Sequence, residues 1–156
     1  TRKESSAASD VYKRQLMYYT LGQRGGIGIG GLKGVAEGAW FVLHKDIENN
    51  RLVIGQGHEH PLMQSTTLWS ETIDWVAGEM QIPETGFRCT SRTRYRQDDQ
   101  DCVIFNDPTT PGGVRVEFDE PQRAVTPGQS VVFYSGEVCL GGGVIHHTNA
   151  PKPDFI

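Results

Sequence analysis

The chain has few cysteines and no long apolar run. Its three cysteines, Cys89, Cys102 and Cys139, form no Cys-x-x-Cys pair. The odd number and the spacing argue against a disulfide framework and against a zinc site, and they favour a reducing compartment such as the cytoplasm. Because no apolar run approaches 20 residues, we expect no membrane-spanning helix. The polar first 15 residues also lack the apolar core of a signal peptide.

Positive charge is scarce as well. The 156 residues carry 15 Lys and Arg against 19 Asp and Glu, which gives a formal net charge of −4. A protein that coats DNA through its phosphates is basic, so we expect no DNA partner. An acidic total still allows a local basic strip.

Glycine is abundant, and one glycine-rich stretch imitates a nucleotide-binding motif. In LGQRGGIGIGG, residues 21–31, Gly26, Gly28 and Gly31 satisfy G-x-G-x-x-G. That motif works only where a helix begins on the glycines, because the helix N-terminus holds the phosphate. Here Gly34 and Gly38 follow, and then the strand-like run WFVL, so the required helix is missing. The stretch is better interpreted as a glycine-rich turn or bulge.

The sequence lacks any long segment with helical periodicity. Instead, short β-leaning runs alternate with turn residues, which is typical of a small antiparallel barrel. Asn49-Asn50 and Pro127-Gly128 mark two of the turns, the second of type II geometry. We expect strands near residues 40–44, 51–55, 87–96, 101–106, 114–118, 130–134 and 137–145, and a further β-leaning stretch over 65–76.

These patterns predict a mainly β protein with two modules. We expect a central β-rich domain over residues 16–78, followed by a small antiparallel β-barrel over 79–147. Residues 77–86 carry Gly and Pro and resemble a linker. The polar residues 1–15 are expected to form a disordered head, and residues 148–156 a tail.

The stretch FRCTSRTRYRQ, residues 87–97, contains four arginines at alternate positions. If the strand runs to Arg96, then Arg88, Arg92, Arg94 and Arg96 share one face and span about 26 Å, at about 3.3 Å per residue. Such a row could contact several phosphates of an RNA backbone. It could equally be a solvated face that pairs with acidic residues on the neighbouring strand.

Two other groups could carry chemistry. His58, Glu59 and His60 have the spacing of a partial metal site, but a polar turn after a strand explains them better. Cys139 precedes three glycines and could be a thiolate nucleophile, although its apolar neighbours favour a buried, inert thiol. Cys89 and Cys102 could lie close together across a strand pair.

Four segments resemble the tRNA-specific 2-thiouridylase family, MnmA, in family order: YYTLGQRGGIGIGG, GQGHEHP, CTSRTRYRQ and AVTPGQSVVFYSGEVCLGGGVI. The resemblance covers residues 16 to about 145. In that family an ATP-pyrophosphatase domain precedes a small central domain and a β-barrel, and this chain resembles the last two. The resemblance implies ATP-dependent 2-thiolation of the wobble uridine of tRNA, with sulfur delivered by a cysteine persulfide.

The chain departs from the family in two ways. The ATP loop Ser-Gly-Gly-Val-Asp-Ser is absent, and the family's two catalytic cysteines belong to segments upstream of Leu16. We therefore expect no catalytic residue, no metal and no bound cofactor in this fragment, and no activity from it alone. ATP, Mg²⁺ and a persulfide-relay donor protein would serve the full-length enzyme. Residues 1–15 match nothing in the family.

The family's tRNA contacts in the barrel correspond to Arg94, Tyr95 and Gln129, and Arg92 and Arg96 are weaker candidates beside them. Arg94 and Tyr95 would point to opposite faces of a regular strand, so a strand end or bulge is needed there. Two other functions stay open. One is a free-standing β-barrel module that binds RNA or protein, and the other is a thiol enzyme that uses Cys139.

Overall fold

The computed structural model describes residues 16, 18–25, 27 and 38–154, and it divides into two units. The first unit contains the described residues up to Gln64 together with residues 151–154, and the second contains residues 65–150. The expected disordered head, residues 1–15, lies outside the described residues. So do Gly26, Gly28 and Gly31 of the motif that imitates a nucleotide-binding loop.

The first unit is built on an antiparallel hairpin of β1 (Trp40–Asp46) and β2 (Arg51–Gln56). As predicted, the turn falls at the asparagines, and Asn50 has a left-handed φ of 52°. The carboxylate of Asp46 holds this turn, because it accepts hydrogen bonds from the Asn49 side chain (2.9 Å) and from Arg51 (2.6 Å). The hairpin therefore has its own polar clamp.

A small apolar cluster covers one side of this hairpin. Phe41 and Leu43 of β1 pack with Met63, which lies in the short 3₁₀ helix η1 (Pro61–Met63). The backbone of Gly22 and Gln23 bonds to both sides of Val42, with N···O distances of 2.7 and 3.0 Å. This segment therefore extends the hairpin edge on the side away from β2.

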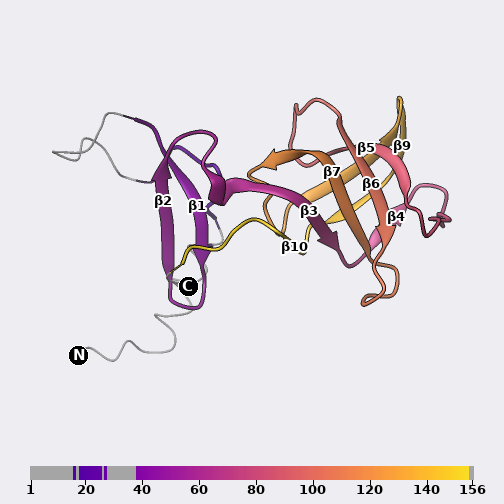
Figure 1. The fold of residues 1–156 in the computed structure, drawn as a ribbon, viewed down its shortest axis with the longest axis horizontal. Helices are drawn as coiled ribbons and strands as arrows, with labels where there is room; N and C mark the ends of the chain where they lie inside the picture. Colours follow the sequence, from indigo (N-terminus) through magenta and orange to yellow (C-terminus); the bar gives the residue numbers. More distant parts are fainter. Residues whose placement is uncertain (1–15, 17, 26, 28–37, 155–156) are drawn as a thin grey trace. The chain divides into compact units, whose positions relative to one another are not determined.

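The second unit is an eight-stranded sheet that curls on itself (Figure 1). Its strands follow the order β10-β3-β7-β6-β5-β8-β9-β4. They are β3 (Gln64–Ser70), β4 (Ile73–Trp75), β5 (Phe87–Arg92), β6 (Gln100–Asn106), β7 (Val114–Arg123), β8 (Ser130–Ser135), β9 (Val138–Val144) and β10 (His147–Thr148).

The two ends of this strand order join and close a barrel. Strand β3 runs directly into β4, and β9 runs directly into β10. The pairs Trp69↔His147 and Ile73↔Gly143 have the same register, so β3–β4 and β9–β10 form one antiparallel ribbon with an interruption in the middle. At the interruption, the buried hydroxyl of Ser70 donates to the Val144 carbonyl (2.7 Å), which keeps the ribbon together.

Alternate residues of the strands fill the barrel interior. On β6, Cys102 and Ile104 are fully buried, and on β8, Val131 and Phe133 are fully buried, while their neighbours in sequence are more exposed. This alternation with a period of two is what a half-buried antiparallel sheet requires. The interior cluster also contains Leu68, Ile73, Cys89, Val114, Val116, Phe118, Val125 and Ile145.

The three glycines of β9 let this strand approach its neighbours closely. A Cβ on Gly143 would fall on the Thr72 carbonyl oxygen, and one on Gly142 would lie 2.7 Å from the Val131 carbonyl oxygen. Real side chains essentially never approach backbone so closely. Glycine is therefore required here by the closure of the barrel.

The mainly β fold with a C-terminal barrel is confirmed, and the boundary between the modules differs from the expected one. The structure divides between Gln64 and Ser65 rather than after residue 78. The reason is that β3 and β4, which were expected to belong to the central domain, supply one side of the closing ribbon. In the described part of the chain, no helix is long and apolar enough to cross a membrane.

We predict that Gly143→Ala destabilises the barrel by about 1–3 kcal/mol, because the added methyl group must push the Thr72 backbone outward. Gly25→Ala is the matched control, since a Cβ there meets no described atom within 4 Å. Urea unfolding of both variants measures the difference. Equal midpoints for the two variants would show that β9 does not need a glycine at position 143.

Candidate nucleic-acid interface

The arginine-rich strand is shorter than the sequence predicts. Strand β5 ends at Arg92, and Arg94 and Arg96 lie in the loop that leads to β6. The prediction of four arginines on one strand face is therefore wrong. Buried Ser91 and Thr93 flank Arg92, and the chain leaves the sheet directly afterwards.

The two arginines that do belong to β5 are paired with acids. Arg88 bonds to Asp119 at 2.8 Å, and Arg92 bonds to Asp99 at 2.5 Å. The hydrogen bond that each arginine donates to its carboxylate partner raises the pKa of that arginine. Arg92 also lies over the Tyr134 ring, with its Cζ 5.2 Å from the ring centroid. These two arginines are thus paired with acids, as one interpretation expected. The acids lie on β7 and in the β5–β6 loop, however, and not on a strand next to β5.

The residues that follow β5, Arg94 to Arg96, lie in a turn and are not paired with acids among the described residues. A turn closes where the Gln97 N–H donates to the Arg94 carbonyl (3.4 Å), and Arg96 within it has a φ of 61°. The Tyr95 side chain is 90% exposed, and the guanidinium of Arg96 lies 5.3 Å from its ring centroid. Neither Arg94 nor Arg96 forms an ion pair with a described residue. The strand end that the resemblance demanded is present, so Arg94 and Tyr95 need not face opposite ways.

A chain of hydrogen-bonded glutamine side chains anchors this loop, and no sequence pattern pointed to it. The Gln97 side chain accepts a hydrogen bond from the Thr93 N–H (2.8 Å) and donates to Gln122 (3.2 Å). Gln122, on β7, is 3% exposed and donates in turn to Gln100 (3.0 Å). Each amide both donates and accepts, so the buried polar groups satisfy one another. Only the pairing of β6 with β7 brings Gln122 to the loop.

Gln129 lies at the same end of the barrel as this loop. Strands β5 and β8 are antiparallel and Arg92 pairs with Val132, so the residues after Arg92 and those before Val132 share one end. Gln129 ends the predicted type II turn, with Gly128 at a φ of 90° and a hydrogen bond from the Gln129 N–H to Thr126 (3.1 Å). The fold thus brings together two segments that lie 34 residues apart in sequence.

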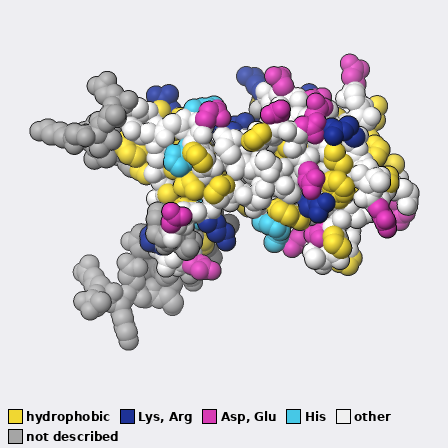
Figure 2. All heavy atoms as spheres, viewed as in Figure 1, with side chains coloured by type: hydrophobic (Ala, Val, Ile, Leu, Met, Phe, Trp, Pro, Cys, Tyr) yellow, Lys and Arg dark blue, Asp and Glu magenta, His cyan; other side chains and the backbone are white. Residues whose placement is uncertain are grey.

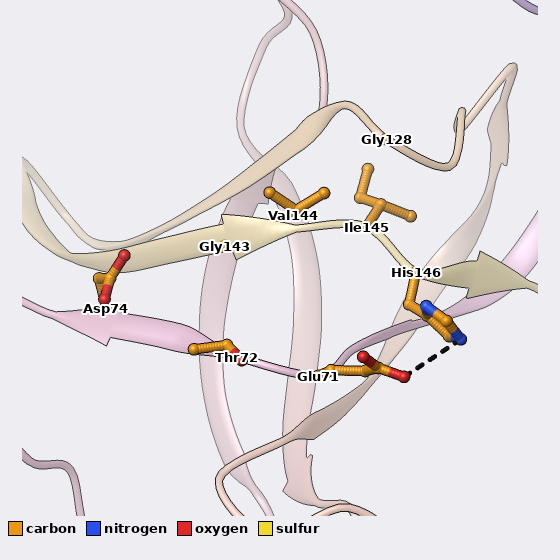
Figure 3. Close-up of a pocket in the computed structure, with 8 residues that line it drawn as sticks. All are labelled: Glu71, Thr72, Asp74, Gly128, Gly143, Val144, Ile145 and His146. Atoms are coloured by element: carbon orange, nitrogen blue, oxygen red, sulfur yellow. Dashed lines mark ion pairs between the residues drawn. The ribbon is translucent and has the colours of Figure 1, made fainter. Parts of the chain in front are cut away.

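A cleft opens beside the Gly128 turn, and no sequence pattern predicts it. Its volume is about 490 Å³, and Figure 3 shows how β4, β9 and the turn enclose it. Nε2 of His146 lies 3.3 Å from a carboxylate oxygen of Glu71. The cleft is lined by Glu71, Thr72, Asp74, Gly128, Val144 and His146, among others.

The other candidate groups have ordinary structural roles. His58 bonds to Glu59 (2.7 Å), and the His60 ring caps η1 by accepting from the Leu62 N–H (3.2 Å). Among the described residues, no group of three or more His, Cys, Asp or Glu is placed to hold a metal ion. These observations agree with the interpretation as a polar turn.

The cysteines divide into a buried pair and an exposed thiol. Cys89 and Cys102 are directly opposite on β5 and β6, with their sulfurs 3.8 Å apart. The hydrogen bond between the thiols and their burial raise the pKa of Cys89. The expectation that Cys139 is buried is wrong: its position on β9 leaves it exposed, and its thiol contacts no catalytic base among the described residues.

No continuous basic surface is visible on the face drawn in Figure 2. The Lys and Arg side chains of the described residues, in dark blue, are scattered among magenta Asp and Glu side chains. A nucleic acid on this face would therefore be held by a few defined residues rather than by a broad electrostatic surface.

Comparisons with known proteins match both units. An aminomethyltransferase β-barrel domain family matches residues 65–145, and a tRNA methyl transferase PRC-barrel domain family matches residues 14–56. The chain is 81% identical over 141 residues to the tRNA-specific 2-thiouridylase MnmA of Acinetobacter baylyi. It is 79% identical over 141 residues to that of Acinetobacter baumannii strain SDF, and 60% identical over 133 residues to that of a Psychrobacter species.

The match covers most of this chain but a smaller share of its relatives. It includes 90% of the chain and 37% of each of the two Acinetobacter proteins. For the Psychrobacter protein the shares are 83% and 33%. The barrel match begins at residue 65, where the second structural unit also begins.

We predict that Gln122→Leu loosens the loop over residues 93–99. The change leaves the amides of Gln97 and Gln100 without their partner, which should lower the free energy of unfolding by about 1–3 kcal/mol. Relative to the parent chain, amide hydrogen exchange should become faster in the loop and stay unchanged in β8. Gln64→Leu, which removes only a bond to exposed Glu59, is the control. Unchanged loop exchange would contradict an anchoring role.

Proposed function

We propose that this chain, which belongs to the tRNA-specific 2-thiouridylase family, is the tRNA-binding C-terminal part of such an enzyme. In this proposal the barrel holds tRNA at the end where the β5–β6 loop and the Gly128 turn meet. The contacts are Arg94, Tyr95 and Gln129, with Arg96 beside them. The other candidate, Arg92, is already paired with Asp99.

One observation carries the proposal. The three positions that the family resemblance singles out come from two distant segments, and the antiparallel pairing of β5 with β8 brings both to one barrel end. The two arginines that precede the loop on β5, Arg88 and Arg92, are already paired with Asp119 and Asp99. Arg94 has no such partner among the described residues, so its guanidinium is available to a phosphate.

Each residue offers a different kind of RNA contact. The planar guanidinium of Arg94 can donate two parallel hydrogen bonds to a phosphate. The exposed ring of Tyr95, with the Arg96 guanidinium over it, can stack on an unpaired base. The Gln129 amide can both donate and accept hydrogen bonds. Because Gln129 follows a tight turn, its backbone position is well defined.

The backbone at Arg96 supports a role in binding. A left-handed φ is unfavourable for residues that have a Cβ, and glycine adopts it without this penalty. Arginine is thus a poor choice for the turn itself. Strained backbone of this kind often accompanies a functional side chain, here one that reinforces Tyr95.

The chemistry proposed for the full-length enzyme follows from the family. It is ATP-dependent 2-thiolation of the wobble uridine in the cytoplasm, with ATP and Mg²⁺ bound by another part of the enzyme and sulfur supplied through a persulfide-relay protein. This chain spans 37% of the length of its Acinetobacter relatives. Its proposed share of the reaction is to hold the tRNA, without thiolating it alone.

We predict that Arg94→Ala weakens the binding of all tRNAs alike and lowers the slope of log affinity against log salt by about 1, because one phosphate contact is lost. Tyr95→Ala should cost about 1–3 kcal/mol of binding with little change in slope, as a stacking residue does. Filter binding across a salt series measures both. Arg88→Ala, which removes an arginine already paired with Asp119, should change neither. If Arg94→Ala behaves like Arg88→Ala in folded protein, the proposed site is wrong.

We also predict that Arg96→Gly changes the stability of the chain and its affinity for tRNA in different ways. Removing the Cβ relieves the left-handed backbone, so thermal stability should stay the same or rise. Affinity for tRNA should nevertheless fall, because the cation over the Tyr95 ring is lost. A variant that gains stability and keeps its full affinity would show that Arg96 has no part in binding.

A further inference from the structure

The cleft beside the Gly128 turn adjoins the proposed tRNA contacts. Gly128 lines the cleft and is followed directly by Gln129. Two backbone hydrogen bonds tie this turn to Ile145, from the Gly128 N–H to the Ile145 carbonyl and from the Ile145 N–H to the Gln129 carbonyl, each at 2.8 Å. Gln129 therefore lies between the Arg94 loop on one side and the cleft on the other.

The two carboxylates of the cleft accept hydrogen bonds and repel phosphate. Glu71 and Asp74 contribute carboxylates, and the described residues that line the cleft include no Lys or Arg. Asp74 faces outward from β4, and its side chain makes no hydrogen bond to a described residue. A phosphate would meet negative charge here, whereas a group with N–H or O–H donors would find acceptors.

The remaining walls suit a flat ring. The Val144 side chain is exposed although it belongs to β9, and the His146 imidazole stands at the far side of the cleft (Figure 3). Gly143, whose Cβ position is blocked by the Thr72 carbonyl oxygen, adds no side chain to the lining of the cleft. The volume of about 490 Å³ falls in the usual range for small-ligand sites, about 300–1,000 Å³.

We propose that this cleft is a nucleoside subsite. It takes one unpaired nucleoside of the RNA that Arg94, Tyr95 and Gln129 hold, and so the inference rests on the proposed function. The base packs on Val144 and His146, while Asp74 and Glu71 accept hydrogen bonds from its N–H edge. Guanosine fits best, because its base edge presents neighbouring ring and amino N–H donors to a carboxylate.

The direction in which one substitution, Asp74→Asn, changes the affinity for tRNA tests this subsite. An acidic residue that only stands near RNA repels it, so its neutralisation strengthens binding or leaves it unchanged. An acidic residue that accepts hydrogen bonds from a base does the opposite. Asp74→Asn should therefore weaken tRNA binding about tenfold, without lowering the salt slope. Asp98→Asn is the matched control, because Asp98 is an exposed aspartate in the Arg94 loop, outside the cleft.

A second measurement uses guanosine alone, at millimolar concentration, with the isotope-labelled chain. NMR shifts are expected at Gly128, Val144 and His146, and Asp74→Asn should abolish them. Uridine should produce smaller shifts, and inorganic phosphate none at these positions. Shifts with phosphate but not with guanosine would overturn the proposal, and so would an Asp74→Asn variant that binds tRNA as tightly as Asp98→Asn does.

Different results would contradict the nucleoside subsite and the tRNA-binding site. If Arg94→Ala weakens tRNA binding and Asp74→Asn does not, the subsite is wrong and the tRNA-binding role stands. If guanosine binds in an Asp74-dependent way but Arg94→Ala leaves tRNA binding unchanged, the site at the loop is wrong and the cleft remains a nucleoside site. Circular dichroism of each variant shows that it is folded.

Discussion

The barrel depends on one constraint, the close approach of β9 to the strands on both its sides. Gly142 lies against the β8 backbone and Gly143 against the chain between β3 and β4, where no side chain fits. Where the ladder breaks, the Ser70 hydroxyl donates a hydrogen bond to the Val144 carbonyl, so that backbone group stays paired. Without this contact the sheet would have two open edges, and the barrel end that carries the proposed site would not exist.

Closure also decides which polar residues are available for binding. Along β5, arginines face acids on neighbouring segments, so Arg88 and Arg92 contribute to the surface of the barrel. Beyond the strand end those acids are no longer opposite, and the chain turns with Arg94 and Tyr95 exposed. The Gln97–Gln122–Gln100 chain holds that turn from within. A rigid scaffold that carries a short, anchored loop is a common arrangement for recognition.

In the two proposals, the loop and the adjoining cleft would contact different chemical groups of the RNA. The loop offers a cation and an aromatic ring, which suit phosphate and base stacking. The cleft offers carboxylates, which suit donors on a base edge and exclude phosphate. Gln129 lies between them on the Gly128 turn. Under these two proposals, a chain with a net charge of −4 would bind RNA selectively, because it would make few contacts, each with a defined partner.

The sequence by itself determined the mainly β class, most strand positions, the turns at Asn50 and Gly128, and the family. These features rest on local patterns of alternation, on turn residues and on short sequence motifs shared with the family. Only the tertiary structure decided that β5 stops at Arg92, that β3 and β4 belong to the barrel, that Cys139 is exposed, and that a cleft adjoins Gln129. Each of these depends on which strands lie side by side, because pairing between residues far apart in sequence sets burial, partners and strand ends.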